Sequence, residues 1–122
     1  MSSSDGHGRA AVVVRDETRV AVIRRVVDGR THFAFPGGAI RSDETPGDAA
    51  RRGAREELGV EVVLGPRLLI EEVGGETTHY YSAVVVRSAD GIRAADPTWL
   101  DIGELPNYTV RPRALAAILT GG

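Results

Sequence analysis

The stretch of sequence that decides the fold is residues 37–60, GGAIRSDETPGDAARRGAREELGV. Thr45 is a good helix N-cap, Pro46 suits the first helical position, and Asp48 stands where the acid of a capping box would stand. Gly59 is a typical C-cap, so the sequence predicts a helix between these two ends. The apolar residues of this helix recur every four positions as one narrow stripe: Ala50, Ala54 and Leu58. One helix face should therefore pack against a core and leave another available for chemistry.

Runs of β-branched and other apolar residues on both sides of this helix predict short strands. We expect strands at residues 10–14, 20–23, 32–35, 60–64, 68–73, 80–86 and 97–100. The polar residues 16–18 and the glycine-containing residues 74–76 predict two hairpins, and the glycines after Pro36 should end the third strand. Residues 112–119 predict a short closing helix with four buried side chains: Ala114, Leu115, Ile118 and Leu119. The fold class is then α/β, of the α+β type, with a mostly antiparallel sheet.

The composition predicts one globular domain. The chain has 122 residues, of which 42% are hydrophobic and 26% are charged, enough for a single core. We assign this domain to residues 9–122 and a flexible tail to residues 1–8, where Ser, Asp and Gly dominate. No apolar run approaches the roughly 18 to 20 residues that cross a bilayer, and the first residues lack the hydrophobic stretch of a signal peptide. We therefore expect a cytoplasmic protein that does not bind membranes.

Missing residue types exclude several chemistries. The chain has no cysteine, which excludes disulfides, thiolate metal sites and cysteine nucleophiles. All 15 basic residues are arginine, which excludes Schiff-base lysines and the lysine of a Walker-type phosphate loop. The net charge of -2 argues against a nucleic-acid partner. A small anionic ligand, held by arginine, backbone or a metal ion, remains compatible with the sequence.

Residues 38–60 resemble the Nudix box. That family pattern begins with a glycine, any five residues, a glutamate and any seven residues. It continues with Arg-Glu, an apolar residue, any residue and Glu-Glu, and it ends with any residue, a glycine and an apolar residue. Eight positions of this chain fall in register: Gly38, Glu44, Arg52, Ala54, Glu56, Glu57, Gly59 and Val60. Matches at such fixed spacing are far more specific than a lone glycine motif. The resemblance implies the Nudix fold, in which a mixed, mostly antiparallel sheet is sandwiched between helices.

The resemblance also implies hydrolysis of a pyrophosphate linkage. A pyrophosphate carries several negative charges, which repel water until a divalent cation neutralises them and orients the attack. Mg²⁺, with Mn²⁺ as an alternative, prefers hard oxygen ligands. Glu56 and Glu57 stand about 100° apart on the helix and can present two carboxylates to one region. By resemblance, Gly37, Glu56 and Glu57 are the metal ligands and the two glutamates are catalytic, whereas a solvated acidic helix face is the competing interpretation.

One position departs from the family pattern. Gly53 stands where the family has a glutamate that joins the metal cluster or acts as the base for the attacking water. A glycine in a helix costs roughly 1 kcal/mol relative to alanine. We therefore expect the glycine to open space over the metal site for another ligand or a water, although relaxed selection on a lost activity would give the same sequence. On the open-space hypothesis, Gly53→Glu should raise turnover without changing the fold.

A replacement carboxylate could come from outside the box. By resemblance, Asp96, which shortly precedes Trp99, is a catalytic candidate. A turn residue before Pro97 is an equally good interpretation of the same aspartate. Three other acids are weaker candidates: Glu71, Glu72 and Glu104.

The remaining motif residues divide into structural and substrate-binding candidates. Glu44 and Arg52 are expected to pair across the loop before the helix in a structural role. The similarity to MutT-like members of the family implies five substrate-binding residues: Arg24, Arg25, Phe35, Gly37 and Gly38. Arg25 would contact phosphate, for which its planar fork is suited, although paired arginines are also common at surfaces.

The identity of the base is left open by the sequence. The asparagine with which MutT-like enzymes recognise a purine falls at Val110, and this weakens an oxidised-guanine substrate. Asn107 could substitute for it. Tyr80, Tyr81 or Phe35 could stack on a base, and each is at least as well explained as a core residue.

Two functions follow from these observations. The first is Mg²⁺-dependent hydrolysis of a nucleoside triphosphate or another nucleoside diphosphate derivative, by a monomer or a homodimer. The second is a module that binds or senses a nucleotide and lost turnover together with its missing glutamate. Two other functions of this fold are less well supported. An isomerase would need an active-site cysteine, which the chain lacks, and a transcription regulator would need an additional DNA-binding domain.

Overall fold

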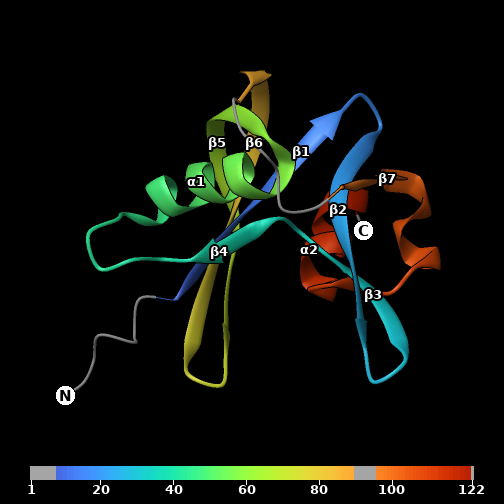
Figure 1. Ribbon diagram of the computed structural model, residues 1–122. Coiled ribbons are helices and arrows are strands. Elements are labelled where there is room, and N and C mark those ends of the chain that lie inside the picture. Colours follow the sequence, from blue (N-terminus) through green and yellow to red (C-terminus); the bar gives the residue numbers. More distant parts are fainter. Residues whose placement is uncertain (1–7, 90–95, 122) are drawn as a thin grey trace.

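The computed structural model describes residues 8–89 and 96–121 of the chain. Within these residues the chain forms one curled sheet, two α-helices and a 3₁₀ helix (Figure 1). None of the helices in this part of the chain is long and apolar enough to cross a membrane. The elements follow in the order β1 (Arg9–Asp16), β2 (Arg19–Val27), β3 (Arg30–Ala34), β4 (Gly37–Ala39), α1 (Pro46–Leu58), β5 (Val60–Val73), β6 (Glu76–Ser88), β7 (Thr98–Asp101), η2 (Ile102–Asn107), β8 (Val110–Arg111) and α2 (Arg113–Thr120).

The central strand of the sheet is β1, which has neighbours along both of its edges. β6 runs parallel to it along one edge, and β5 pairs with β6 to continue the sheet on that side. Along the other edge, β4 pairs with the start of β1 and β2 pairs with its end. β3 and β7 pair with β2, and β8 pairs with β3. Five of the seven pairings among the described residues are antiparallel, which confirms the predicted mixed and mostly antiparallel sheet.

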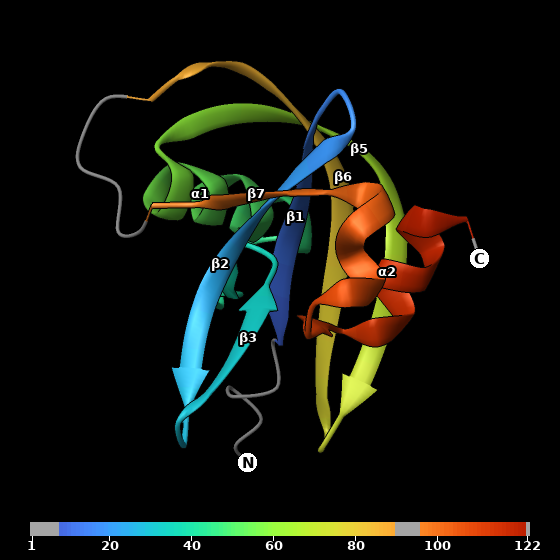
Figure 2. The same cartoon turned by 90° about the vertical axis from the view of Figure 1, so that its right-hand side faces the viewer.

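Helices cover the two faces of the sheet, and each helix lies over its own apolar core. Successive residues of a strand point to opposite faces. Ala10, Val12 and Val14 therefore pack with α1, in what we call the α1-side core, and Ala11 and Val13 belong to the α2-side core. Figures 1 and 2 show α1 and α2 on opposite sides of β1. The predicted stripe of the first helix lies in the α1-side core, as expected: Ala50, Ala54 and Leu58.

The prediction for the closing helix was right in position and partly wrong in orientation. Leu115 is fully buried in the α2-side core, and Leu119 packs against that core. Ala114 is exposed and Ile118 is 44% exposed, contrary to the predicted buried side. The reason is that α2 has only eight residues and packs mainly on η2 and β8, so that a single narrow face is covered.

Several strands differ from their predicted bounds. β5 is one continuous strand, because the predicted break between residues 64 and 68 is an irregularity in its pairing with β6. The third strand ends at Ala34, just before the glycines that were expected to end it, and Gly37 and Gly38 then belong to β4, which pairs with β1. Both η2 and β8 were missed. Of the predicted flexible tail, residues 1–7 lie outside the described part of the chain, whereas Gly8 is buried and its carbonyl accepts a 2.9 Å hydrogen bond from the Ile40 N–H group.

Candidate functional site

The helix that carries the predicted site begins and ends as its caps predict. Thr45 Oγ1 accepts a 3.1 Å hydrogen bond from the Asp48 N–H group, and the Asp48 carboxylate accepts one of 3.3 Å from the Thr45 N–H group. At the other end, Gly59 has the left-handed φ of 68° that favours glycine, and its N–H group donates to the Arg55 carbonyl. These caps fix the start of α1, and thereby which of its side chains face β4.

Gly53 is the point at which α1 comes closest to β4. A Cβ atom at this position would lie 3.0 Å from Gly37 Cα and 3.2 Å from the Gly37 carbonyl carbon. Gly37 is packed even more tightly against β1, because its own Cβ would lie 2.3 Å from the Ala10 carbonyl oxygen. The expected open space over the site is therefore absent, and that prediction was wrong. Gly53 instead permits a close backbone approach between helix and strand, which is a typical use of glycine.

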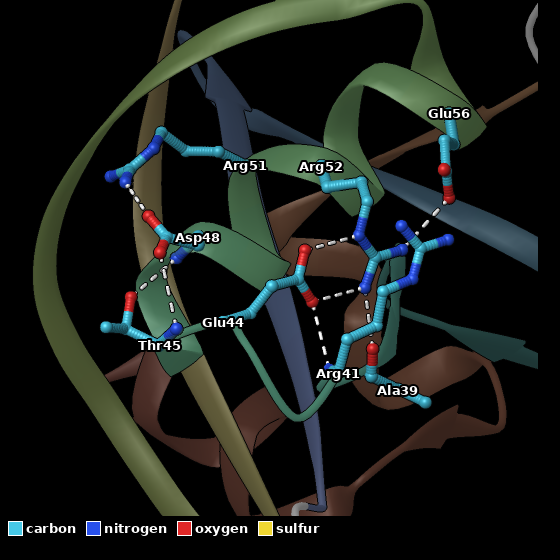
Figure 3. Close-up of polar contacts among 8 residues, drawn as sticks. All are labelled: Ala39, Arg41, Glu44, Thr45, Asp48, Arg51, Arg52 and Glu56. Atoms are coloured by element: carbon cyan, nitrogen blue, oxygen red, sulfur yellow. Dashed lines mark hydrogen bonds and ion pairs between the residues drawn. The ribbon is translucent and has the colours of Figure 1, made fainter.

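Arg52 joins α1 to the loop before it and to β4 (Figure 3). Its Nε and Nη2 atoms donate to the two carboxylate oxygens of Glu44 at 2.7 and 2.8 Å, and Nη2 also donates to the Ala39 carbonyl at 2.7 Å. The hydrogen bonds from Arg52, and then that from the Arg41 N–H group, lower the pKa of Glu44 to about 2. The expected pairing of Glu44 and Arg52 is thus present as a two-bond fork, the geometry that Arg–carboxylate pairs favour.

Glu57 and Glu56 occupy different surroundings although they are adjacent in the chain. Glu57 Oε1 accepts a 3.0 Å hydrogen bond from the Gly37 N–H group, and Oε2 lies 3.6 Å from Arg25 Nη2. The Glu57 side chain is only 17% exposed. Glu56 is 53% exposed, and its Oε1 atom lies 3.2 Å from Arg52 Nη1. Glu57 therefore stands at the junction of α1, β4 and β2, and Glu56 stands on the outer side beside Arg52.

The donors around this junction suit a hard divalent cation. Glu57 contacts Gly37 directly, and Glu56 is its neighbour on α1. Mg²⁺ is commonly held by one or two carboxylates while it keeps several waters, so two glutamates are a sufficient protein contribution. Among residues 8–89 and 96–121, no group of three or more His, Asp or Glu side chains is arranged to hold an ion. At this junction the described residues offer the Glu57 carboxylate and, one residue away on α1, that of Glu56, which contacts Arg52 instead.

Asp96 is exposed and lies in the segment that leads into β7. β7 is antiparallel to β2, with Thr98 opposite Val22. Asp96 and Pro97, just before Thr98, therefore lie toward the end of β2 that carries Arg25. The weaker acidic candidates have other surroundings. Glu72 accepts a hydrogen bond from Thr77, and Glu104 accepts one from Asn107. Glu71 lines a large cavity beside Tyr80.

A small cavity opens beside Gly37, and a large cavity adjoins it. The small cavity has a volume of about 120 Å³ and is lined by residues that include Arg9, Arg25, Phe35 and Gly37. The large cavity has a volume of about 630 Å³ and is mainly apolar. The two cavities share three lining residues: Ala34, Tyr80 and Arg111. Three of the five predicted substrate-binding residues thus line the small cavity, whereas Arg24 and Gly38 line neither.

The candidate base-contacting residues are separated by the fold. Tyr80 lies between the two cavities, and burial raises the pKa of its hydroxyl. Phe35 is 5% exposed and belongs mainly to the α2-side core. Tyr81 packs on the α1 side of the sheet, and the Asn107 amide donates to Glu104. Val110 is buried in β8 opposite Phe33.

Sequence reasoning missed Arg9 and Arg111. Arg9 begins β1 and Arg111 ends β8, and both line the small cavity. No local pattern marks either residue, because the cavity forms only where strands distant in sequence come together. A search for arginines next to predicted strand ends could have found Arg9 but not Arg111, because β8 was not predicted.

Comparison with known proteins agrees with the box and the fold. The NUDIX domain family matches residues 6–117. A "MutT-like protein" from Streptomyces ambofaciens is 42% identical over 81 residues, which cover 64% of this chain and 47% of that relative. The chain thus spans about half the length of the relative that it matches.

Solved structures share the fold at low identity. A NUDIX-family hydrolase from Clostridium perfringens superposes with a TM-score of 0.74 at 17% identity, covering 95% of this chain and 94% of that one. The E. coli ORF135 protein superposes with a TM-score of 0.68 at 23% identity, covering 92% and 84% of the two chains. MutT, studied from Aliivibrio salmonicida and Vibrio cholerae, gives a TM-score of 0.68 at 19% identity, with coverage of 93% and 94%. The family match over most of the chain, the motif and the fold agree, and this chain belongs to the Nudix hydrolase family, with similarity to its MutT-like members.

Proposed function

We propose that this chain hydrolyses the pyrophosphate linkage of a nucleoside diphosphate derivative with the help of Mg²⁺ or Mn²⁺. The observation that carries the proposal is the position of Glu57, a largely buried carboxylate in contact with Gly37 and Arg25, which both line the small cavity. Glu56, Glu57 and the Gly37 carbonyl would hold the ion. When bound, the ion supplies charge neutralisation and orientation for the attacking water.

The chain's own residues have separate tasks in this proposal. Arg25 both contacts Glu57 and lines the small cavity, so its guanidinium is placed to steady phosphate charge beside the carboxylates. Glu57 or Asp96 accepts the proton of the attacking water. The Arg52–Glu44 pair acts as a positioning pair, because it ties α1 to the loop and to β4. The large cavity offers an apolar surface for the nucleoside.

A second candidate function rests on Gly53. The helix carries no carboxylate at this position, and the contact with Gly37 leaves no room for one without a shift of the backbone. A domain of this kind could bind a nucleotide without turnover. We keep this binding or sensing module as the alternative.

The test is incubation of the purified protein with Mg²⁺ or Mn²⁺ and a panel of nucleoside triphosphates, oxidised dGTP, ADP-ribose and nucleotide sugars. Chromatographic separation identifies the products and the broken bond. The hydrolase predicts metal-dependent cleavage that is abolished by Glu57→Gln. The matched control is Glu61→Gln, at a carboxylate whose partner is Arg87 on the neighbouring strand, and this variant should keep full activity. Inactivity across the panel together with measurable nucleotide binding would instead support the binding module.

A further inference from the structure

We propose that Arg9, Arg25 and Arg111 bind the phosphate group attached to the nucleoside, so that the small cavity holds this phosphate and the large cavity holds the nucleoside. The inference rests on the proposed function in taking the ligand to be a nucleotide. It goes further in naming the side chains that distinguish a nucleotide from a nucleoside.

The charged residues around the small cavity favour an anion. Three arginines from three different strands, β1, β2 and β8, line the small cavity, and no carboxylate among the described residues lines it. In the described part of the chain, Arg9 and Arg111 have no ion pair, and the Arg25–Glu57 contact of 3.6 Å is long for a direct hydrogen bond. Like charges around one cavity repel one another, and an anion bound there reduces that repulsion. Guanidinium groups are also well suited to phosphate oxygens.

The two cavities differ in size. A volume of about 120 Å³ is well below the roughly 300 Å³ at which cavities for larger organic ligands begin, so the small cavity suits a phosphate and not a base with its sugar. The large cavity, at about 630 Å³, lies inside the range for such ligands. Its apolar lining includes Val73, Val110 and Pro112.

The two cavities lie next to each other, because Tyr80 and Arg111 line both of them. Gly37 and Arg25 line the small cavity on the side where Glu57 stands. A nucleotide with its base in the large cavity would therefore extend its phosphates through the small cavity toward the two glutamates.

The experiment measures binding by calorimetry in EDTA at low salt, with GMP, AMP, guanosine, adenosine and inorganic phosphate as separate ligands. Arg9→Gln and Arg111→Gln should each weaken GMP or AMP binding about ten-fold or more, because each removes a charged hydrogen-bond donor. Arg15→Gln is the matched control: it removes the same charge from the same strand as Arg9, is exposed, and lines neither cavity. This control should change binding by less than about two-fold.

Equal losses in all three variants, or no loss in the two cavity variants, would overturn the proposal. Guanosine and adenosine should bind far more weakly than GMP and AMP and should be insensitive to Arg9→Gln. Inorganic phosphate that binds as tightly as GMP would show an isolated anion site and would overturn the link to the large cavity. Since no metal or turnover is involved, a protein that fails to hydrolyse but shows arginine-dependent GMP binding refutes the proposed hydrolase and leaves this inference standing.

Discussion

Replacing Gly53 with alanine should destabilise the protein, although alanine is the better helix former. In an open helix interior the substitution would gain about 1 kcal/mol. Here the new methyl group would lie 3.0 Å from Gly37 Cα, and overpacking of a close-packed contact costs about 1–3 kcal/mol. Gly37 has little room to retreat because β1 lies directly behind it. The cost exceeds the gain, and we expect a net loss of about 1 kcal/mol.

Urea unfolding followed by circular dichroism measures this difference, and thermal melting should show a Tm about 4 °C lower than that of the unmodified chain. Gly47→Ala is the control in the same helix. The nearest atom to a Cβ there is Leu64 Cδ1 at 3.4 Å, an ordinary contact, so this variant should gain about 0.5 kcal/mol. If Gly53→Ala stabilises the protein as much as Gly47→Ala does, the close approach of α1 and β4 is not what requires the glycine.

Three further predictions test the site and the core. Gly53→Glu should lower both the free energy of unfolding and the turnover, because the Cβ of the new side chain would meet the backbone of Gly37. A higher kcat at unchanged stability would instead support open space over the site. The pKa of Glu44 is lowered from 4.5 to about 2, so its stabilising contribution is complete above about pH 4.5 and is lost as the pH falls toward 2. Glu44→Gln should therefore flatten the acid part of the stability profile from urea unfolding at several pH values, and an unchanged profile would contradict the Arg52 contact as its cause. Leu115→Ala should cost about 3 kcal/mol, and Ile118→Ala less than about 0.5 kcal/mol, in the same unfolding assay; similar losses would mean that α2 packs through another face.

The first helix could be predicted from sequence because its signals are local. The Thr45–Asp48 capping box and Gly59 lie within a few residues of the ends that they determine. The pairing of Glu44 with Arg52 also depends on a short separation along the chain. The motif spacing thus predicted the position of the two glutamates on the helix. Their different partners, Gly37 and Arg25 for Glu57 and Arg52 for Glu56, are seen only in the structure.

Features set by distant segments could not be predicted in this way. The role of Gly53 depends on how closely β4 lies against α1, which no spacing within the helix reveals. The break expected near Gly65 failed for the same reason, since pairing with β6 carries β5 through an irregularity. Arg111 belongs to a two-residue strand whose pairing partner, β3, lies far away in the sequence.

The burial of β1 on both faces has a consequence for how the protein opens. Residues 10–14 lie between the two cores, and each is at most 5% exposed. Backbone amides in such a strand exchange with solvent only when the whole domain unfolds, whereas exposed hairpin ends exchange earlier. β4 pairs with this strand and α1 packs on it, so Gly37 and Glu57 are attached to the slowest-exchanging part of the molecule. The arrangement of these two residues should accordingly persist on heating until the domain melts as a unit.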